Sequence, residues 1–194
     1  DYINYRTRVS DKLLELQEHN EIDIIETPDW GAETVLFEKY RKVPLIVRLH
    51  TPLGIWAKAN SSELDPSIHK QMLKWEKKMI ESADKVTSCT EILKDLVKKE
   101  LKITRKDIEV IPNPVNFEDF YVKRLRGRKR KTILYCGSIE QRKGVILLAH
   151  AIPNIIERIG NVKFLFVGKD TNRNEEGIST IEYIKNIVPS KYHK

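Results

Sequence analysis

Residues 132–168 place two apolar runs on either side of a helical pattern, and this arrangement constrains the fold more than any other stretch. The run 132–136 ends at Gly137, the segment 145–159 repeats apolar residues at helical spacing, and a second run ends at Gly168. Two strands joined by a helix of this length favour parallel pairing with a right-handed crossover. We therefore expect a βαβ unit, in which ligands collect at the carboxyl ends of the strands.

The loop between the first strand and the helix has the composition of an anion site. Gly137 lets the backbone turn and approach a ligand, and Lys143 and Gly144 stand where the unpaired N–H groups of a helix start attract anions. Phosphate is the expected anion, although glycine after a strand and lysine early in a helix also occur without a ligand. Neither G-x-G-x-x-G nor G-x-x-x-x-G-K-[ST] is present, which argues against dehydrogenases and P-loop NTPases.

The preceding residues continue the alternation of helices and strands. Helices are expected at 9–17, 32–41, from Asp65 and Pro66 onward, and at 91–100; strands are expected at 22–25, 45–49, 85–88 and 108–111. In the helix after Pro66, the residues Ile68, Met72, Trp75 and Met79 share one face and form an expected core stripe. The chain is therefore predicted to be an α/β protein with parallel sheets.

Several blocks, in order, resemble a known family. The first is DIIETPDWGAE (23–33), followed by LIVRLHTP (45–52), then Trp75-Glu76-Lys77 with SADKV (82–86), then IPNPVN (111–116) with Phe120, and finally ILYCGSIEQRKGVILLAHAI and FLFVGKD. Together they resemble GT-B glycosyltransferases of family 4 (group 1) type. The resemblance covers roughly residues 20 to 190. It implies two Rossmann-like domains and an enzyme that transfers a sugar from a nucleotide-diphosphate sugar.

The resemblance also implies a domain plan. Residues 1–120 correspond to the acceptor-side domain, residues 121–131 to a basic linker, and residues 132–194 to the first part of the donor-binding domain. The family's first strand with its glycine-rich loop and its E-x7-E motif have no counterpart here; Glu175, Glu176 and Glu182 do not match that motif. Both domains are thus expected to be incomplete. The chain is interpreted as an internal fragment that is inactive alone.

In this family the donor diphosphate binds where the second domain's first strand gives way to its first helix. Carried over, the donor-phosphate residues are Gly137, Ser138, Arg142, Lys143 and Gly144. The family usually has Arg directly after the strand glycine, where this chain has Ser138, which donates a hydrogen bond without a charge. Arg142 is a candidate to compensate. The resemblance implies a retaining hexosyltransferase that builds a polysaccharide or glycolipid, and the alternative is a non-catalytic nucleotide-sugar-binding or protein-interaction module of the same fold.

Acceptor-side candidates follow the strands of the first domain. His50 matches a family histidine near the reacting sugar and is assigned to positioning rather than to proton abstraction; without the family, it could equally cap a backbone carbonyl. Asp29, Trp30 and Glu33 follow the preceding strand and are candidates to shape the acceptor pocket, while the alternative for Trp30 is to cover the sheet edge.

The net charge of +7 comes from one basic run, because the other 28 Lys and Arg residues balance the 28 Asp and Glu residues. The run comprises Lys123, Arg124, Arg126, Arg128, Lys129, Arg130 and Lys131. It is interpreted first as a solvated linker and second as a contact with an anionic membrane surface. RNA binding ranks third because no aromatic residues interleave the run, so nucleic acid is not an expected partner.

No cofactor or metal is expected, since the histidines are scattered and no Cys/His cluster occurs. Cys89 and Cys136 are interpreted as lone thiols, and Cys136 is expected to be a small buried side chain in its strand. With no apolar run approaching the length of a membrane span and no signal-peptide pattern, the expected location is the cytoplasm, with peripheral contact at the inner face of the membrane as an extension.

Overall fold

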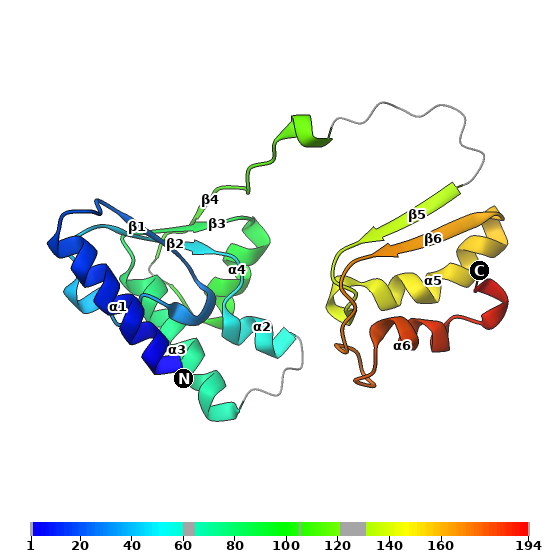
Figure 1. The fold of residues 1–194 in the computed structure, drawn as a ribbon, viewed down its shortest axis with the longest axis horizontal. Helices are drawn as coiled ribbons and strands as arrows, with labels where there is room; N and C mark the ends of the chain where they lie inside the picture. The colour runs from blue at the N-terminus through cyan, green and yellow to red at the C-terminus, as the bar shows by residue number, and fades with distance from the viewer. Residues whose placement is uncertain (1, 60–64, 105, 121–130, 194) are drawn as a thin grey trace. The chain divides into compact units, whose positions relative to one another are not determined.

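The computed structural model describes residues 2–59, 65–104, 106–120 and 131–193. The chain divides into two compact units, Asp1–Asn116 and Phe117–Lys194. Each unit is an α/β layer structure with a parallel sheet (Figure 1), and this confirms the predicted fold class.

The first unit is built around four short parallel strands in the order β1-β2-β3-β4. Its elements are α1 (Tyr2–Glu18), β1 (Ile25–Pro28), the 3-10 turns Trp30–Ala32 and Glu38–Tyr40, β2 (Leu45–Leu49), α2 (Leu53–Ala59), α3 (Pro66–Ser82), β3 (Lys85–Ser88), α4 (Glu91–Glu100) and β4 (Glu109–Val110). In register, Ile25 lies opposite Leu45 and Val47 opposite Val86. Because all four strands run the same way, their carboxyl ends share one edge of the sheet.

Local sequence explains where the two long helices after β2 begin. Asp65 caps α3 by accepting hydrogen bonds from the backbone N–H groups of Ser67 (2.8 Å) and Ile68 (3.3 Å), and Pro66 occupies the first turn, where its missing N–H costs nothing. Thr90 caps α4 in the same way through the N–H of Leu93 (3.1 Å).

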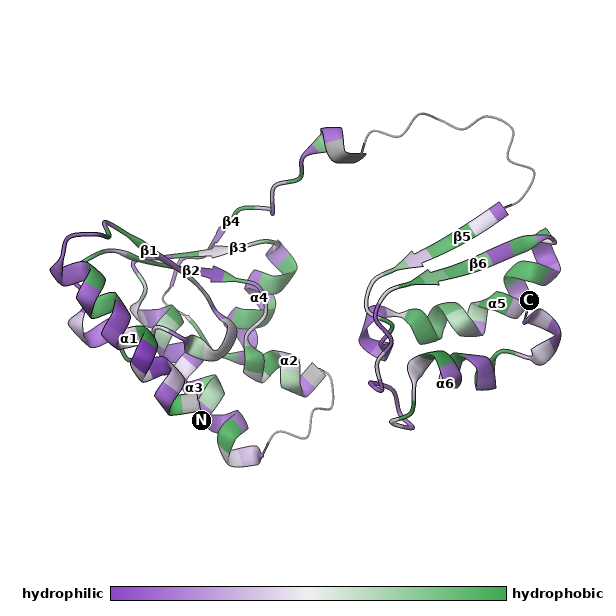
Figure 2. Ribbon diagram, in the orientation of Figure 1, coloured by the Kyte–Doolittle hydropathy of each residue, from purple (hydrophilic) through white to green (hydrophobic). Residues whose placement is uncertain are grey.

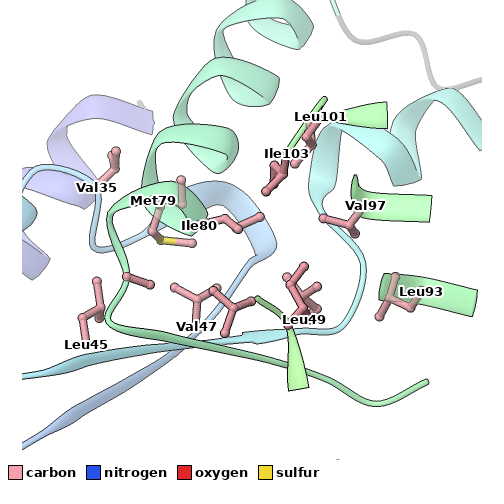
Figure 3. Close-up of a cluster of buried hydrophobic side chains, with 14 of the residues drawn as sticks. Val35, Leu45, Val47, Leu49, Met79, Ile80, Leu93, Val97, Leu101 and Ile103 are labelled. Carbon is pink, nitrogen blue, oxygen red and sulfur yellow. The ribbon is translucent and has the colours of Figure 1, made fainter. Parts of the chain in front are cut away.

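The core of the first unit lies between the sheet and the helices. Leu45, Val47 and Leu49 alternate on one face of β2 and are fully buried. Figure 3 shows them facing Met79 and Ile80 from α3 and Val97 from α4. Burying apolar side chains of this size contributes about 1.5–3 kcal/mol each relative to exposure, so this layer supplies much of the unit's stability.

The second unit carries a two-stranded parallel sheet, as the βαβ prediction requires. Its elements are the 3-10 turn Phe117–Phe120, β5 (Lys131–Cys136), the 3-10 turn Gln141–Lys143, α5 (Val145–Ile159), β6 (Val162–Val167), α6 (Thr180–Ile187) and the 3-10 turn Ser190–Tyr192. The strands pair from Lys131 opposite Val162 to Cys136 opposite Val167. Figure 2 shows apolar residues along both strands and along α5.

Only one face of this second sheet is covered by the described residues. Tyr135 and Phe166 pack with the core of α5 and α6, in which Val145 and Ala149 are fully buried. The opposite face carries Leu134, Cys136, Leu165 and Val167, all of which are exposed. The expectation that Cys136 is buried was therefore wrong, because its side chain points to the face opposite α5.

Several other predictions were wrong in detail. In place of the expected helix at 32–41, the backbone forms turns that end in the 3-10 turn Glu38–Tyr40. A helix cannot begin at Ala32 because this residue (φ 50°) and Gly31 before it (φ 69°) adopt left-handed conformations. The strand expected at 22–25 begins only at Ile25, where pairing with Leu45 starts. Residues 53–59, for which neither a helix nor a strand was predicted, form α2.

The helix stripes were right in part. In α3, Met72 and Met79 are buried, while Ile68 is at the surface. In α4, Leu93 and Val97 are buried, whereas Ile92 is 81% exposed. None of the helices within the described ranges combines the length and hydrophobicity needed to cross a membrane.

Candidate functional site

At the carboxyl edge of the first sheet, Asp29 joins the loops that follow β1 and β2. Its side chain is fully buried, and both carboxylate oxygens accept the backbone N–H of His50 at 3.1 Å. The N–H of Thr51 adds a third bond at 3.3 Å. Asp29 therefore faces the main chain of the next loop. This geometry suits a residue that fixes the position of His50.

Glu76, which sequence reasoning did not single out, does the same for neighbouring backbone. It projects from the middle of α3 and is fully buried. Its Oε1 accepts the N–H groups of Gly31 (3.0 Å) and Leu53, and its Oε2 accepts that of Gly54 (3.1 Å). The sequence did contain a clue, because a charged residue between Met72 and Met79 falls on the apolar stripe of the helix and is conspicuous there.

Burial raises the pKa of both carboxyl groups. For Asp29 the pKa rises from 3.8 to about 6, because loss of water outweighs the favourable bonds from the N–H groups of His50 and Thr51. For Glu76 the pKa rises from 4.5 to about 7, because burial again outweighs the N–H bonds, which lower the pKa. The nearby charge of Asp29 adds to the rise. Neighbouring carboxyl groups with shifted pKa values occur at functional sites and also where carboxylates hold backbone in place.

The remaining acceptor-side candidates lie nearer the surface. His50 is exposed at the end of β2. Trp30 is 40% exposed and makes an edge-to-face contact with Trp56 of α2, with ring centroids 5.4 Å apart. Glu33 accepts a hydrogen bond from the hydroxyl of Tyr5 (3.2 Å), and the Glu33 charge raises the pKa of that tyrosine. The structure thus brings His50, Asp29 and Trp30 to one edge, whereas Glu33 turns toward α1.

In the second unit, the two strand ends are in very close contact. The N–H of Gly137 donates to the carbonyl of Val167 (2.9 Å), and a Cβ added to Gly168 would overlap the carbonyl oxygen of Gly137. Both glycines have positive φ angles, 147° for Gly137 and 158° for Gly168. Close packing therefore requires glycine at position 168, whereas Gly137 has room for a Cβ and contributes through its N–H and carbonyl groups.

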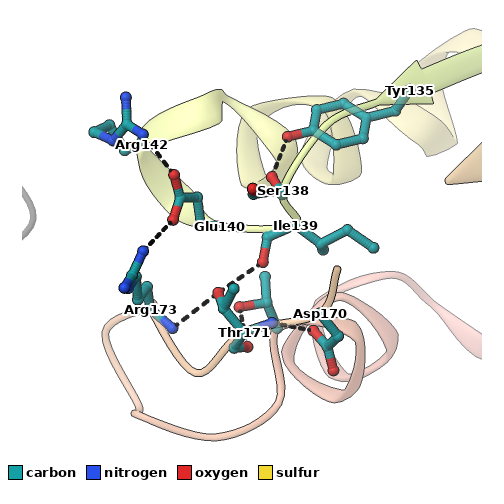
Figure 4. Close-up of polar contacts among 9 residues, drawn as sticks. Tyr135, Ser138, Ile139, Glu140, Arg142, Asp170, Thr171 and Arg173 are labelled. Carbon is teal, nitrogen blue, oxygen red and sulfur yellow. Dashed lines mark hydrogen bonds and ion pairs between the residues drawn. The ribbon is translucent and has the colours of Figure 1, made fainter. Parts of the chain in front are cut away.

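The loop after Gly137 is organised by a buried carboxylate of the second unit (Figure 4). Glu140 is 2% exposed and accepts from Arg142 at 2.7 Å and from Arg173 at 3.0 Å. Arg173 comes from the loop after β6, and its carbonyl also accepts the N–H of Gln141 (3.1 Å). The guanidinium of Arg142, expected to contact phosphate, thus already binds a carboxylate. Glu140 and Arg142 are only two positions apart, but the second partner, Arg173, lies 33 positions away and is not revealed by the local sequence.

Lys143 and Gly144 lie at the start of α5, as predicted. Gly144 is the N-cap with φ 78° and provides no side-chain cap, so the first amides of the helix have no side-chain acceptor from that residue. Lys143 is exposed, and within the described ranges its ammonium group makes no hydrogen bond or ion pair. Ser138 is exposed beside them, and its carbonyl accepts the hydroxyl of Tyr135 at 2.8 Å.

The loop carries charges of both signs. Arg142 and Arg173 bind the buried Glu140, and Glu175 accepts a hydrogen bond from Gln141. Lys143 adds one exposed ammonium group near the first amides of α5. Among the described residues, no group of three or more His, Cys, Asp or Glu side chains is arranged to hold a metal ion. The basic run 123–131 lies outside the described residues except for Lys131.

Comparison with known protein families gives one result for this chain. Residues 2–119 match the family model described as Glycosyltransferase Family 4. The matched range spans α1 to β4 and includes Asp29, His50 and Glu76. A comparison with curated proteins gave no match.

Proposed function

The chain belongs to glycosyltransferase family 4, and from this premise we propose that it serves the transfer of a hexose from a nucleotide-diphosphate sugar to an acceptor with retention of configuration. The observation that supports the donor part of this proposal is Lys143, an exposed ammonium beside the uncapped start of α5. Fixed positive charge and backbone N–H groups at one place suit a diphosphate.

The chemical step would use this charge directly. The bond between the sugar C1 and the diphosphate oxygen breaks through an oxocarbenium-like state, and the electron pair leaves with the diphosphate. Lys143 stabilises the negative charge that develops on this leaving group. The acceptor hydroxyl bonds to C1 on the same face, and its proton passes to a phosphate oxygen. His50 and Asp29 hold the acceptor-side loop rather than move this proton.

Ser138 would contribute less than the arginine that the family has at its position, and Arg142 would compensate only in part. Ser138 can offer one hydrogen bond, and Arg142 shares its guanidinium with Glu140. This favours a second candidate function, in which the chain binds a nucleotide sugar without transferring it. We further propose that the acceptor is a sugar or a lipid-linked sugar and that the reaction belongs to polysaccharide or glycolipid synthesis. Residues 123–131 would make peripheral contact with anionic lipid.

The test is calorimetric titration of the purified chain with UDP, GDP and their glucose and mannose conjugates, followed by an assay for released nucleoside diphosphate. Saturable binding supports a donor site, and the absence of binding by every nucleotide contradicts it. Binding without release fits both candidates, because the chain is expected to be inactive by itself, whereas release excludes the second candidate. Release by this chain alone would contradict our expectation that it is inactive by itself.

A further inference from the structure

Within the described part of the chain, Glu76 bonds only to the main chain of two loops. Its three hydrogen bonds come from the N–H groups of Gly31, Leu53 and Gly54, and none comes from a side chain among the described residues. Gly31 belongs to the turn after β1, and the other two begin α2. A buried carboxylate that binds main-chain donors alone fixes the position of backbone rather than neutralising a cation.

The two loops are shaped to meet this carboxylate. Gly31 has φ 69°, a conformation that favours glycine, and its carbonyl accepts a bond from Arg6 of α1. A Cβ on Gly54 would lie 2.6 Å from Cγ of Leu73, so only glycine allows α2 to pack this closely on α3. The carbonyl of Gly54 contacts Nε2 of His69 at 2.8 Å. Both glycines are therefore held through their N–H and carbonyl groups.

The contact between Trp30 and Trp56 depends on the spacing of the two loops. Trp30 directly precedes Gly31, and Trp56 lies two positions after Gly54. Their rings meet edge to face at 5.4 Å, and Trp30 remains 40% exposed beside the loop that carries His50. Aromatic faces with an apolar body and a polar edge suit the packing of a sugar ring.

We propose that Glu76 is a positioning residue for the acceptor: its single carboxylate sets the spacing between the turn at 30–32 and the start of α2, and thereby holds Trp30 against Trp56 as a wall for an acceptor sugar. The position of the loops follows from the contacts above, and the assignment to an acceptor sugar rests on the proposed function.

A titration of the unmodified chain followed by NMR tests the shared carboxylate. The amide resonances of Gly31, Leu53 and Gly54 should move together with one midpoint, because all three N–H groups bind the same group, whose pKa burial raises to about 7. His69 contacts Gly54 and Asp29 lies nearby, so the variants His69→Gln and Asp29→Asn identify their shares of the movement. Unequal midpoints, stationary resonances, or a common titration that persists in Glu76→Gln would overturn the proposal.

The tryptophan pair tests the positioning itself. At about pH 8, above the raised pKa, the exciton couplet of Trp30 and Trp56 in circular dichroism should vanish in Glu76→Ala. It should weaken less in Glu76→Gln, whose carbonyl oxygen can still accept from Gly31 and Leu53 while its NH2 group faces the N–H of Gly54. Glu81→Gln, an exposed change on the same helix, is the matched control and should leave the couplet intact. A folded Glu76→Ala with a full couplet contradicts positioning. If Glu76→Ala does not fold, the NMR titration decides.

UDP binding separates this proposal from the donor proposal. Glu76 lies in the first unit, whereas Lys143 lies in the second. UDP affinity should therefore be unchanged in Glu76→Gln. Absence of UDP binding by the unmodified chain would count against the donor site alone, and the couplet and the NMR midpoints would still judge Glu76.

Discussion

The carbonyl oxygen of Gly137 occupies the space that a side chain on Gly168 would need. These residues end the two paired strands of the second unit, so their contact decides how closely β5 and β6 approach at the candidate diphosphate site. Backbone on both sides of the contact leaves no flexible side chain to move aside.

We therefore expect Gly168→Ala to lower the free energy of unfolding of the second unit by about 2–3 kcal/mol, from overpacking together with an unfavourable φ angle. Denaturant unfolding followed by far-UV circular dichroism measures this. Gly177→Ala is the matched control, because Gly177 also has a positive φ angle (68°) but has space for a Cβ. It should cost about 1 kcal/mol from backbone strain alone. Equal costs for the two variants would contradict the contact.

The buried carboxylates of the first unit should make its stability fall as pH rises. In the native state the pKa of Asp29 is raised to about 6 and that of Glu76 to about 7, above their values of 3.8 and 4.5. At pH values between the ordinary and the raised pKa of each group, the folded form therefore binds more protons than the unfolded chain. The stability that these protons add is fully present at low pH and is lost as pH rises through the raised pKa values. The shift at Glu76 corresponds to about 3 kcal/mol.

Tryptophan fluorescence during urea unfolding measures this dependence for the first unit alone, because Trp30, Trp56 and Trp75 all lie there. The free energy of unfolding should be greater at about pH 5 than at about pH 8. Glu76→Gln should remove the larger part of the difference, and Glu81→Gln should leave it intact. A stability that increases over this range would show that the N–H bonds outweigh burial.

Lys143→Ala should weaken UDP binding or, in an active form of the enzyme, turnover by about 10²- to 10³-fold, the effect of losing one charge-stabilising group. Lys163→Ala is the matched control, since Lys163 is exposed on β6 and pairs with Thr132 at the other end of the strands. Titration calorimetry compares the two. If both variants bind UDP as the unmodified chain does, Lys143 does not contact the diphosphate.

Glu140→Gln should loosen the loop that joins β5 to α5. One amide cannot accept from both Arg142 and Arg173 as the carboxylate does, so one guanidinium loses its charged partner. Because both arginines are partly exposed, we expect a loss of about 1–3 kcal/mol in the second unit. Thermal unfolding measures it, with the exposed Glu175→Gln as control. Similar melting of both variants would show that the Glu140 pairs add little stability.

Replacing the seven Lys and Arg residues of the run 123–131 by Gln should abolish binding to vesicles rich in phosphatidylserine, because each basic residue near such a surface contributes about 1 kcal/mol. Vesicle flotation at low and physiological salt measures this. Unchanged flotation would leave the run as a linker.

Sequence predicted the elements whose signals are local. Strands 45–49 and 85–88 and helix 91–100 have the predicted bounds, because apolar pattern, cap and burial agree there. The resemblance to family 4 glycosyltransferases is confirmed over residues 2–119. Residues 32–41 could not be predicted in this way, since Gly31 takes its conformation beside Glu76, which is 45 positions away.

The candidate sites show the same limit. The apolar pattern of 145–159 predicted that Lys143 and Gly144 precede a helix, and in the structure they lie directly before α5. Arg142 binds Glu140 only two positions away, but the burial of that carboxylate and its second partner Arg173, 33 positions along the chain, follow from the fold rather than from a local pattern. Glu76 was part of a recognised block, but its role depends on folding that brings two distant loops to one helix.

The contact of Arg6 with the carbonyl of Gly31 has a practical consequence for trimming the chain. The same guanidinium lies 4.7 Å from the ring centre of Trp75, so the first helix touches both the turn after β1 and α3. A shortened version starting at β1 would leave a buried carbonyl without its donor and expose an indole face. Residues 2–18 thus belong to the cooperative folding unit, and expression boundaries for crystallisation should keep them.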